Sequence, residues 1–346
     1  MTAIIPVAGA GTRLRPFTYT QPKPLIPVAG KPILSYIVDQ LLGLGVEEFV
    51  FVIGYLGDKV RDYIAEAYPA LGARFVEQAE RRGSGHAVWL AREAIGAGVE
   101  EVVVVFGDTL IDGDLAGIVA CEHTCLAVKP VDDPRRFGVI EFDAAGMVAR
   151  MVEKPRMPKS NEAMVGFYKV ADYPALHDTL GRLLDAHGDA TAAGPSSGAG
   201  GGAATPEITL TDGLMALLDA GHRMHAERVD RWYDCGDADV LLATNRAFLD
   251  ERGYGDVETP AFDGTIVIHP VSIGRGCTIE HAIIGPHVSI GDFATVRRSI
   301  VSDSIVGRYA RLDSVRLEAS VVGNDTSLTG RRQSINIGDN TELKLG

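Results

Sequence analysis

Residues 3–16 have the sequence Ala-Ile-Ile-Pro-Val-Ala-Gly-Ala-Gly-Thr-Arg-Leu-Arg-Pro. A short apolar run that ends at Val7 is followed at once by a turn containing Gly9 and Gly11. Glycines after a first strand let backbone amides approach phosphate groups, because no side chain stands in the way. The turn lacks the third glycine of the dinucleotide fingerprint, with Leu14 in its place, and it lacks the Gly-Lys-Ser/Thr ending of a P-loop. Taken alone, it fits a turn selected for geometry as well as it fits a phosphate site.

Beyond this turn, short β-rich runs alternate with amphipathic stretches as far as about residue 130. The runs cover residues 3–7, 48–53, 73–76, 102–106 and 124–128. Their nearly continuous apolar character is typical of parallel strands that are covered on both faces. A helix is predicted from Pro32 onward, because apolar residues recur at helical spacing: Ile33, Leu34, Ile37, Val38, Leu41 and Leu42. We therefore predict a three-layer α/β domain with a mostly parallel, Rossmann-like sheet.

The pattern changes after residue 130. Residues 139–142 and 148–152 flank an Asp-Ala-Ala-Gly turn at 143–146, which predicts a β-hairpin that acts as a lid or subdomain. Residues 188–206 are almost wholly Gly, Ala, Ser, Thr and Pro. Such a composition cannot bury enough apolar area to offset its ordering entropy, so we expect a mobile surface loop there.

A hexapeptide repeat begins at about residue 262. An aliphatic residue followed by glycine recurs at Ile273-Gly274, Ile284-Gly285, Ile290-Gly291, Val306-Gly307 and Val322-Gly323. In most of these units the sixth residue further on is again aliphatic, so each unit forms one flat face of a triangular coil. The pattern predicts a short left-handed parallel β-helix. An antiparallel sandwich of short strands is the alternative, although it does not require glycine directly after the inward aliphatic residue.

The length of 346 residues fits two domains, which we place at residues 1–252 and 262–346. The net charge of -13 repels phosphate backbones and argues against a nucleic-acid partner. No apolar run reaches the roughly 18 residues of a membrane span, and the chain opens into a strand without a charged leader. The four cysteines lack Cys-x-x-Cys spacing. A reducing cytoplasm is therefore the expected location.

A second motif follows the glycine-rich turn, at Lys23-Pro24-Leu25-Ile26-Pro27-Val28. Together the two motifs, over residues 9–28, resemble the signature of the nucleotidylyltransferases that activate sugar phosphates: Gly-x-Gly-Thr-Arg-Leu-x-Pro, a Thr, then Lys-Pro-Leu-x-Pro-Val. The resemblance implies that Arg13 grips a nucleoside triphosphate and that Lys23 neutralises phosphoryl charge during transfer. It also assigns nucleotide binding to the turn residues Ala8, Gly9, Gly11 and Thr12.

Two aspartates are candidates for a magnesium site. Asp108 stands at the carboxyl end of the strand run 102–106, where open α/β sheets place ligands. Asp234 lies in Trp232-Tyr233-Asp234-Cys235-Gly236, which resembles the family's Trp-x-Asp-x-Gly segment. Two carboxylates that face one hard cation suit Mg2+ with retained waters and phosphate oxygens. Asp237 is interpreted instead as the cap of the following helix.

The base and sugar sites are read from the same resemblance. The spacing of Gln78 and Gly83 matches relatives that accept uracil or thymine, and a glutamine amide can both donate to and accept from the imide edge. His86 is interpreted as structural. On the sugar side, the resemblance assigns binding of the sugar phosphate to a further set that shares the family's Glu-Lys-Pro and glycine motifs: Gly138, Glu153, Lys154 and Val165. Lys154 is expected to hold the phosphate and to join Arg13, Lys23 and Asp108 as a catalytic residue.

The combination of domains most resembles the long-form glucose-1-phosphate thymidylyltransferases, which implies dTTP or UTP with glucose 1-phosphate as substrates. Mannose-1-phosphate guanylyltransferases share the layout and are the first alternative. Hexapeptide coils also build acetyltransferases, in which case His269, His281 and His287 would be candidate bases, although the tail is short for such a site. A catalytically inactive regulatory subunit is a third alternative. An open-ended coil favours stacking on another copy, so a homo-oligomer assembled through the repeat domain is expected.

Overall fold

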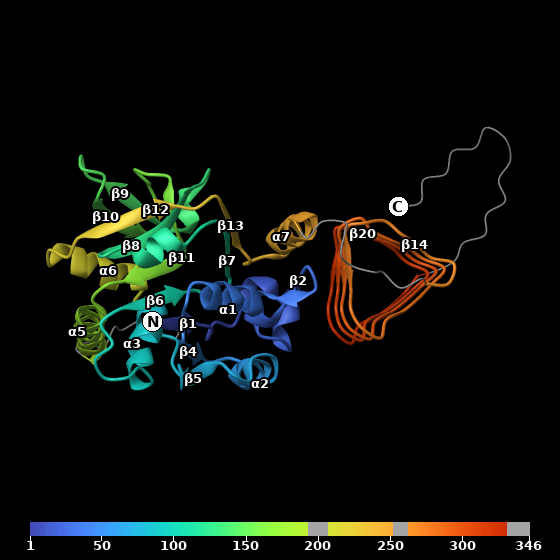
Figure 1. Ribbon diagram of the computed structural model, residues 1–346, viewed down its shortest axis with the longest axis horizontal. Helices are drawn as coiled ribbons and strands as arrows, with labels where there is room; N and C mark the ends of the chain where they lie inside the picture. The colour runs from blue at the N-terminus through green and yellow to red at the C-terminus, as the bar shows by residue number, and fades with distance from the viewer. Residues whose placement is uncertain (193–206, 252–261, 331–346) are drawn as a thin grey trace, which may run out of the picture. The chain divides into compact units, whose positions relative to one another are not determined.

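The computed structural model describes residues 1–192, 207–251 and 262–330. The contacts of the chain divide it into two compact units, which Figure 1 shows as ribbons. The first unit consists of Met1–Ile26 and Lys31–Val240, and the second of Pro27–Gly30 and Leu241–Gly346. Helix α7 (Ala238–Glu251) therefore belongs mainly to the second unit, whereas the sequence-based boundary assigned it to the first domain.

The first unit is built on a mixed sheet. Its strands are β1 (Thr2–Pro6), β4 (Glu48–Ile53), β5 (Gly72–Glu77), β6 (Val102–Val105), β8 (Thr124–Pro130), β9 (Gly138–Phe142), β10 (Val148–Glu153), β11 (Glu162–Val170) and β12 (Met224–Arg228). The order is β10-β9-β11-β6-β1-β4-β5, and β8 pairs with both β11 and β12. A separate ribbon is formed by β7 (Thr109–Asp112) and β13 (Arg231–Asp234), and two short strands, β2 (Pro27–Val28) and β3 (Lys31–Pro32), follow the glycine-rich segment.

The mostly parallel core is confirmed for β6, β1, β4 and β5, which are parallel throughout. The run predicted at residues 124–128 forms β8, which pairs with β12 in the parallel direction. Its other neighbour, β11, is antiparallel to both β8 and β6 and lies between them, so β8 runs in the same direction as β6 without pairing with it. The continuous apolar sequence of β8 fits its burial, but it does not reveal the antiparallel strand beside it.

Helices cover both faces of the sheet, as expected for three layers. They are α1 (Ile33–Gly43), α2 (Gly57–Ala67), α3 (Ser84–Leu90), α4 (Ala116–Ala120), α5 (Tyr173–Ala192) and α6 (Leu210–Asp219). One core joins β1, β4 and β6 to α3, α5 and α6 through fully buried side chains such as Ile4, Val104, Val88, Leu180 and Leu214. Helix α2 packs on β4 and β5. Within the described ranges, no helix combines the length and the apolar content that crossing a bilayer requires.

The hairpin prediction is confirmed, since β9 and β10 pair in the antiparallel direction around the 143–146 turn. The predicted loop at 188–206 is wrong at its beginning, because α5 continues to Ala192. Alanine-rich sequence has high helix propensity, and the helix already established upstream continues into it. Residues 193–206 of the predicted loop lie outside the described residues.

The second unit contains three four-stranded parallel sheets, as expected for a triangular β-helix (Figure 1). The first consists of β14 (Ile266–Val267), β17 (Ile283–Ile284), β20 (Ile300–Ser302) and β23 (Arg316–Glu318). The second consists of β15 (Val271–Ile273), β18 (Val288–Ile290), β21 (Ile305–Val306) and β24 (Val321–Val322). The third consists of β16 (Thr278–Glu280), β19 (Thr295–Arg297), β22 (Arg311–Asp313) and β25 (Ser327–Thr329). The predicted inward aliphatic residues Ile284, Ile290 and Val306 are buried. Residues 331–346 of the predicted repeat lie outside the described residues.

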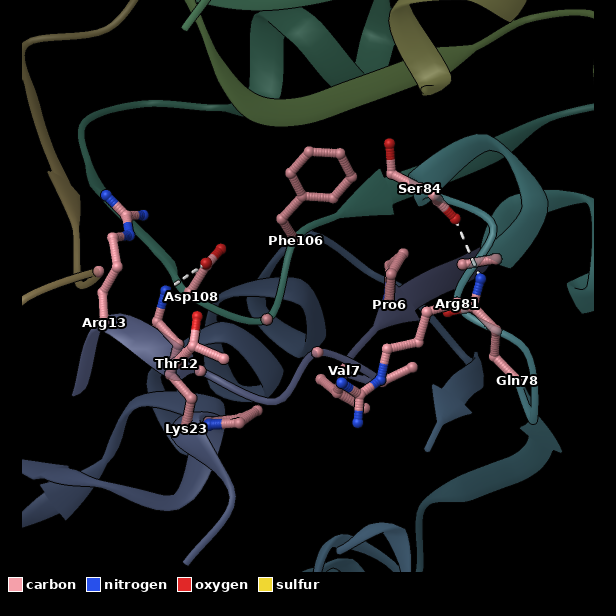
Figure 2. Close-up of a pocket in the computed structure, with 18 of the residues that line it drawn as sticks. Pro6, Val7, Thr12, Arg13, Lys23, Gln78, Arg81, Ser84, Phe106 and Asp108 are labelled. Carbon is pink, nitrogen blue, oxygen red and sulfur yellow. Dashed lines mark hydrogen bonds and ion pairs between the residues drawn. The ribbon is translucent and has the colours of Figure 1, made fainter. Parts of the chain in front are cut away.

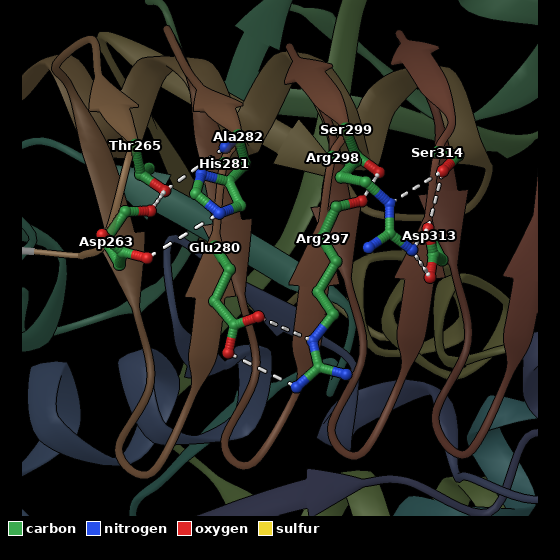
Figure 3. Close-up of polar contacts among 10 residues, drawn as sticks. All are labelled: Asp263, Thr265, Glu280, His281, Ala282, Arg297, Arg298, Ser299, Asp313 and Ser314. Carbon is green, nitrogen blue, oxygen red and sulfur yellow. Dashed lines mark hydrogen bonds and ion pairs between the residues drawn. The ribbon is translucent and has the colours of Figure 1, made fainter. Parts of the chain in front are cut away.

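Charged side chains link successive coils on the outer surface of this unit (Figure 3). Arg297 contacts Glu280 at 3.0 Å, and Arg298 pairs with Asp313 on the next coil. The buried side chain of Asn245 attaches helix α7 to the rest of the second unit. Its Oδ1 atom accepts hydrogen bonds from the Ala29 amide at 2.9 Å and from the Ser289 hydroxyl at 2.6 Å. The second unit therefore combines an aliphatic interior with polar ties between its layers.

Candidate active site

A pocket of about 390 Å3 lies at the carboxyl ends of the parallel strands, and Figure 2 shows the side chains around it. Nine of the residues singled out in the sequence line it: Ala8, Gly9, Gly11, Thr12, Arg13, Lys23, Gln78, Gly83 and Asp108. They come from four separate segments of the chain. The parallel sheet brings them together because β1, β5 and β6 all end at this edge.

The glycine-rich turn adopts a conformation that requires glycine at one position. Gly11 has φ 58, in the left-handed region, and a Cβ atom added there would lie 2.9 Å from Cγ2 of Thr18. The Thr18 hydroxyl donates to the Gly11 carbonyl at 2.8 Å. The turn leads directly into a short 3-10 helix, η1 (Thr12–Leu14), so the backbone from Ala8 to Thr12 faces the pocket.

Lys23 and Asp108 form an ion pair in the pocket (Figure 2). The Lys23 side chain is 11% exposed, so its ammonium is largely removed from water. Burial alone would raise the pKa of the Asp108 carboxyl, but the Lys23 ammonium outweighs it and the pKa lies below its usual value, with a further contribution from Arg13. Asp108 is therefore ionised at neutral pH and stays a ligand for a cation.

Arg13 and Asp234 form a second pair, with 3.7 Å between Nη2 and the carboxylate. Asp234 ends β13, where it pairs with Thr109, the neighbour of Asp108. Burial raises the pKa of Asp234, and the Asp108 carboxylate raises it further, against the opposing effects of Lys23 and Arg13. The two aspartates, 126 residues apart by number, are thus close enough to repel each other.

These two carboxylates fit a magnesium ion. Burial and then the nearby Asp108 carboxylate raise the pKa of Asp234, and a cation between the two carboxylates would offset both effects. In the described part of the chain, no group of three or more His, Cys, Asp and Glu side chains could hold a metal. A two-carboxylate site suits Mg2+, which keeps several waters and takes phosphate oxygens as further ligands.

Gln78 lies at the other end of the pocket, after β5, and is 7% exposed. Its Nε2 atom donates to the Gly83 carbonyl at 3.0 Å and contacts Nδ1 of His86 at 3.2 Å. Gly83 has φ 96, and the Ile208 carbonyl would be 2.2 Å from an added Cβ atom. The Ile208 amide donates to the Arg82 carbonyl, and the Ile208 carbonyl accepts from the Gly85 amide, both at 2.9 Å. Hydrogen bonds to Gln78 and to Ile208 therefore hold the loop formed by residues 82–85 in place.

Three of the residues expected to bind the sugar phosphate lie on the β9–β10 hairpin or directly after it, and the fourth, Val165, lies on β11. Gly138 pairs with Glu153 across the two strands. The Thr211 hydroxyl donates to Oε2 of Glu153 at 2.7 Å, and Lys154 Nζ lies 3.5 Å from Oε1. Lys154 has φ 43, a conformation that non-glycine residues seldom adopt and that often occurs at functional sites. Its side chain is 65% exposed and free to move.

None of this group lines the 390 Å3 pocket, but one hydrogen bond and one electrostatic effect connect the group with Asp108 or its neighbour. The Thr109 hydroxyl, next to Asp108, donates to the Val165 carbonyl at 3.0 Å. Burial raises the pKa of Tyr168, and the nearby Glu153 and Asp108 carboxylates add to that shift. The Val165 side chain is fully buried, so only its backbone could contact a sugar.

Sequence reasoning missed several pocket residues: Arg81, Ser84, Phe106, Gly107, Glu207 and Gly236. Arg81 could have been found, because two consecutive arginines follow a strand that ends at a ligand-binding edge. Glu207 carries no such signal, since only the fold brings it to the pocket. The interpretation of Asp237 as a helix cap is confirmed, because Oδ1 accepts from the Val240 amide at 3.0 Å.

Comparison with known proteins identifies the family of the chain. Residues 2–175 match the nucleotidyl transferase family model. A glucose-1-phosphate thymidylyltransferase of Streptomyces griseus is 30% identical, over 95% of this chain and 94% of that protein. The bifunctional protein GlmU of Methanococcus vannielii is also 30% identical, over 95% of this chain and 73% of that protein.

A crystal structure of a UDP-glucose pyrophosphorylase complexed with UDP-glucose shares the fold, with a TM-score of 0.59 at 23% identity. The match covers 72% of this chain and 99% of the other. The family model covers half of the chain and the Streptomyces griseus relative almost all of it, and both agree with the fold described above. The chain therefore belongs to the nucleotidyl transferase family, as a sugar-phosphate nucleotidyltransferase.

Proposed function

We propose that the protein transfers a nucleotidyl group from UTP or dTTP to glucose 1-phosphate and releases pyrophosphate. One observation carries the proposal: Arg13, Lys23 and Asp108 line one pocket beside a glycine turn, where Lys23 pairs with Asp108 and Arg13 pairs with Asp234. Such a cluster offsets the charge of two phosphorylated substrates that would otherwise repel each other.

In the reaction, an oxygen of the sugar phosphate forms a bond to the α-phosphorus of the nucleotide, and the bond to the pyrophosphate oxygen breaks. In this proposal Lys23 stabilises the charge that develops on the α-phosphoryl oxygens, which its place in the pocket beside the glycine turn supports. Arg13, more exposed and at the mouth of the turn, is suited to the outer phosphates. Backbone amides of the turn supply further donors. Positioning and charge stabilisation account for catalysis of this kind, since no covalent bond to the protein is needed.

Asp108 and Asp234 would hold Mg2+. When bound, the ion supplies positive charge to the phosphate oxygens and fixes their orientation. Lys23 and Arg13 would then share their carboxylate partners with the ion, and their positive charges would be available to the nucleotide. Lys154, exposed and close to Glu153, is suited to hold the sugar phosphate, while Glu153 and the Gly138 backbone bind the hydroxyls.

The test is a matrix of nucleoside triphosphates against hexose 1-phosphates, with pyrophosphate release as the readout and with Mg2+ present or chelated. We expect the highest kcat/KM for UTP or dTTP with glucose 1-phosphate, and no turnover after chelation. Highest activity with GTP and mannose 1-phosphate would replace the proposed substrates by the guanylyltransferase alternative. Absence of pyrophosphate release from every pair would refute nucleotidyl transfer and favour the regulatory subunit.

The acetyltransferase alternative depends on three histidines of the second unit. The Nε2 atom of His287 lies 2.9 Å from a carboxylate oxygen of Asp250, and its Nδ1 atom lies 3.3 Å from a carboxylate oxygen of Asp303. The Nε2 atom of His281 lies 3.7 Å from a carboxylate oxygen of Asp263. These pairs tie His281 and His287 to neighbouring segments, which supports structural roles for these two. A coenzyme A assay with the purified protein checks this directly.

We also propose that the protein is a homo-oligomer that assembles through its repeat unit. Ile266 and Ile300 are 60% and 43% exposed on the outer face of one sheet, and Ile283 connects them in register. An aliphatic stripe of this kind is stabilised by covering it.

The four cysteines are all free, which supports the expected reducing cytoplasm.

A further inference from the structure

The side-chain amide of Gln78 has both of its hydrogens occupied inside the protein. One is donated to the Gly83 carbonyl at 3.0 Å, and this contact fixes which end of the amide is nitrogen, since a carbonyl can only accept. The other points at Nδ1 of His86, 3.2 Å away. Because Nε2 offers only hydrogens, the Nδ1 atom that faces it presents its lone pair, and the ring proton resides on the far nitrogen.

The surroundings of His86 keep the imidazole neutral and in place. Burial lowers the pKa of His86, and the Arg82 guanidinium lowers it further, against the opposing effect of Glu80. The ring stacks on Trp89 with 6.1 Å between centroids and 20° between planes. Trp89 in turn stacks on His177 at 5.7 Å and 5°. A charged His86 would place a hydrogen against the hydrogen of Gln78, so neutrality and the observed contact agree.

The oxygen of the amide is what remains for a ligand. Gln78 lines the pocket, and among the residues that the structure describes no group donates to its Oε1 atom. The sequence alone had suggested that this glutamine offers both a donor and an acceptor to a base. The geometry corrects that expectation, because the donor end is turned away into the protein.

An acceptor at this point distinguishes two classes of nucleobase. Uracil, thymine and guanine each carry a ring N–H in the middle of the pairing edge. Cytosine and adenine carry a ring nitrogen lone pair at the same place. A lone pair facing Oε1 leaves two acceptors in contact beside a side chain that is only 7% exposed, which is unfavourable.

We propose that His86 is a positioning residue for base selection: by accepting the second N–H of Gln78 it leaves only Oε1 facing the pocket, and the site therefore takes bases with a ring N–H and rejects cytosine and adenine. The inference rests on the proposed function, since it assigns the nucleotide base to the Gln78 end of the pocket. It adds a residue that the resemblance left as structural.

The first test compares kcat/KM for UTP and CTP with the same sugar 1-phosphate. The two nucleotides differ only at the edge that faces Gln78. We expect at least about a hundredfold preference for UTP, in line with sites built around one buried hydrogen bond. Equal use of UTP and CTP would overturn the inference while leaving nucleotidyl transfer established. No transfer from either nucleotide, or from GTP and dTTP, would refute the proposed function itself.

The second test isolates His86 with a matched pair of variants. His86→Leu removes the acceptor, so a buried N–H of Gln78 is left without a partner and gains by turning toward the pocket, where cytosine N3 can accept it. We expect the UTP/CTP ratio to fall about tenfold, with KM for UTP raised and kcat nearly unchanged. His86→Asn places an oxygen near the former Nδ1 position and should restore the ratio.

A merely structural role predicts a different result. Loss of packing would lower activity toward UTP and CTP in parallel, and thermal unfolding of each variant shows how much packing is lost. If His86→Leu folds and keeps the wild-type ratio, the positioning role of His86 is wrong. If the UTP/CTP ratio falls as far in His86→Asn as in His86→Leu, selection depends on the volume of the imidazole and not on its lone pair. The positioning role of His86 is then wrong as well.

Discussion

The charged side chains of the site are partners of one another before any substrate is considered. Lys23 and Arg13 were predicted as phosphate-binding cations, and Asp108 and Asp234 as metal ligands, each for its own reason. In the structure each cation forms an ion pair with one of the aspartates, Lys23 with Asp108 and Arg13 with Asp234. Each cation thus neutralises a carboxylate that would otherwise be costly to bury. Substitution of one member therefore acts on its partner as well as on the reaction.

Asp108→Ala should abolish activity while the protein stays folded. The change removes a proposed magnesium ligand and leaves the buried Lys23 ammonium without its partner. We expect kcat to fall by at least about 1000-fold, measured as pyrophosphate release at saturating substrates. Asp112→Ala is the control, since Asp112 lies on the same short strand β7 and pairs with Arg231. Wild-type turnover in Asp108→Ala would contradict the proposed catalytic cluster.

Asp234→Asn should raise thermal stability at neutral pH and lower activity. The folded-state pKa of Asp234 is raised, so its ionised form is disfavoured by folding and costs stability above the ordinary carboxyl pKa. Asparagine removes that cost. The difference in Tm between variant and wild type should be positive at pH 7 and should vanish below about pH 4, where the aspartate is protonated in both states. A lower Tm for the variant at pH 7, in chelator, would show that the Arg13 contact outweighs burial.

At this scale, the sequence indicated which residues share the pocket better than how they are arranged. The family resemblance pointed to Arg13, Lys23 and Gln78, and the end of a predicted strand pointed to Asp108; all four line the pocket. The orientation of the Gln78 amide could not be predicted, since it depends on His86 and on a backbone carbonyl in a folded loop. The pairing of Arg13 with Asp234 likewise requires β7 and β13 to be adjacent.

The loop between β5 and α3 is the element that connects base recognition to the core, and one glycine tests it. Gly83→Ala requires a side chain at φ 96 and places a Cβ atom 2.2 Å from the Ile208 carbonyl. We expect a loss of more than about 1 kcal/mol in the free energy of unfolding and a raised KM for the nucleotide. Gly96→Ala is the control, because no atom lies within 4 Å of its added Cβ. Equal Tm values for the two variants would mean that the loop moves freely.

The positions of the strands along the sequence could be predicted from their apolar pattern. Which strands lie next to one another in the sheet could not. The runs at 48–53 and 102–106 lie in β4 and β6 almost to the residue, since buried parallel strands are marked by continuous apolar sequence. Strand β11, which separates β6 from β8, was read only as part of a pocket. All nine of its residues are buried, yet its antiparallel direction is fixed by the connections on either side, which no local pattern encodes.

The β-helix allows interior packing to be compared with surface charge in one element. Ile284→Ala removes a fully buried side chain from the coil and should cost about 2–5 kcal/mol of unfolding free energy. Arg297→Ala removes an ion pair to Glu280 whose side chains are 45% and 39% exposed, and should cost less than about 1 kcal/mol. Denaturant melts of the two variants check this. Similar losses would mean that the ladder in Figure 3 contributes as much as the core.

For the whole molecule, assembly is the property that the second unit is proposed to supply. The outer stripe formed by Ile266, Ile283 and Ile300 runs across three coils, and apolar area in this arrangement is stabilised when a second copy covers it. The repeat suits this purpose, because coils of equal size present their side chains in a flat row. The pocket residues all belong to the first unit, whereas the stripe belongs to the second.

Ile300→Asp should therefore convert the protein to a monomer without loss of activity per chain. A carboxylate on the stripe has to be desolvated when two copies meet, which opposes association. Light scattering at micromolar concentration measures the mass, and pyrophosphate release measures turnover. Thr278→Asp, on the exposed face of β16 in a different sheet, is the matched control and should keep the wild-type mass. A wild-type monomer would refute assembly altogether, and an oligomer unaffected by Ile300→Asp would exclude this stripe as its interface.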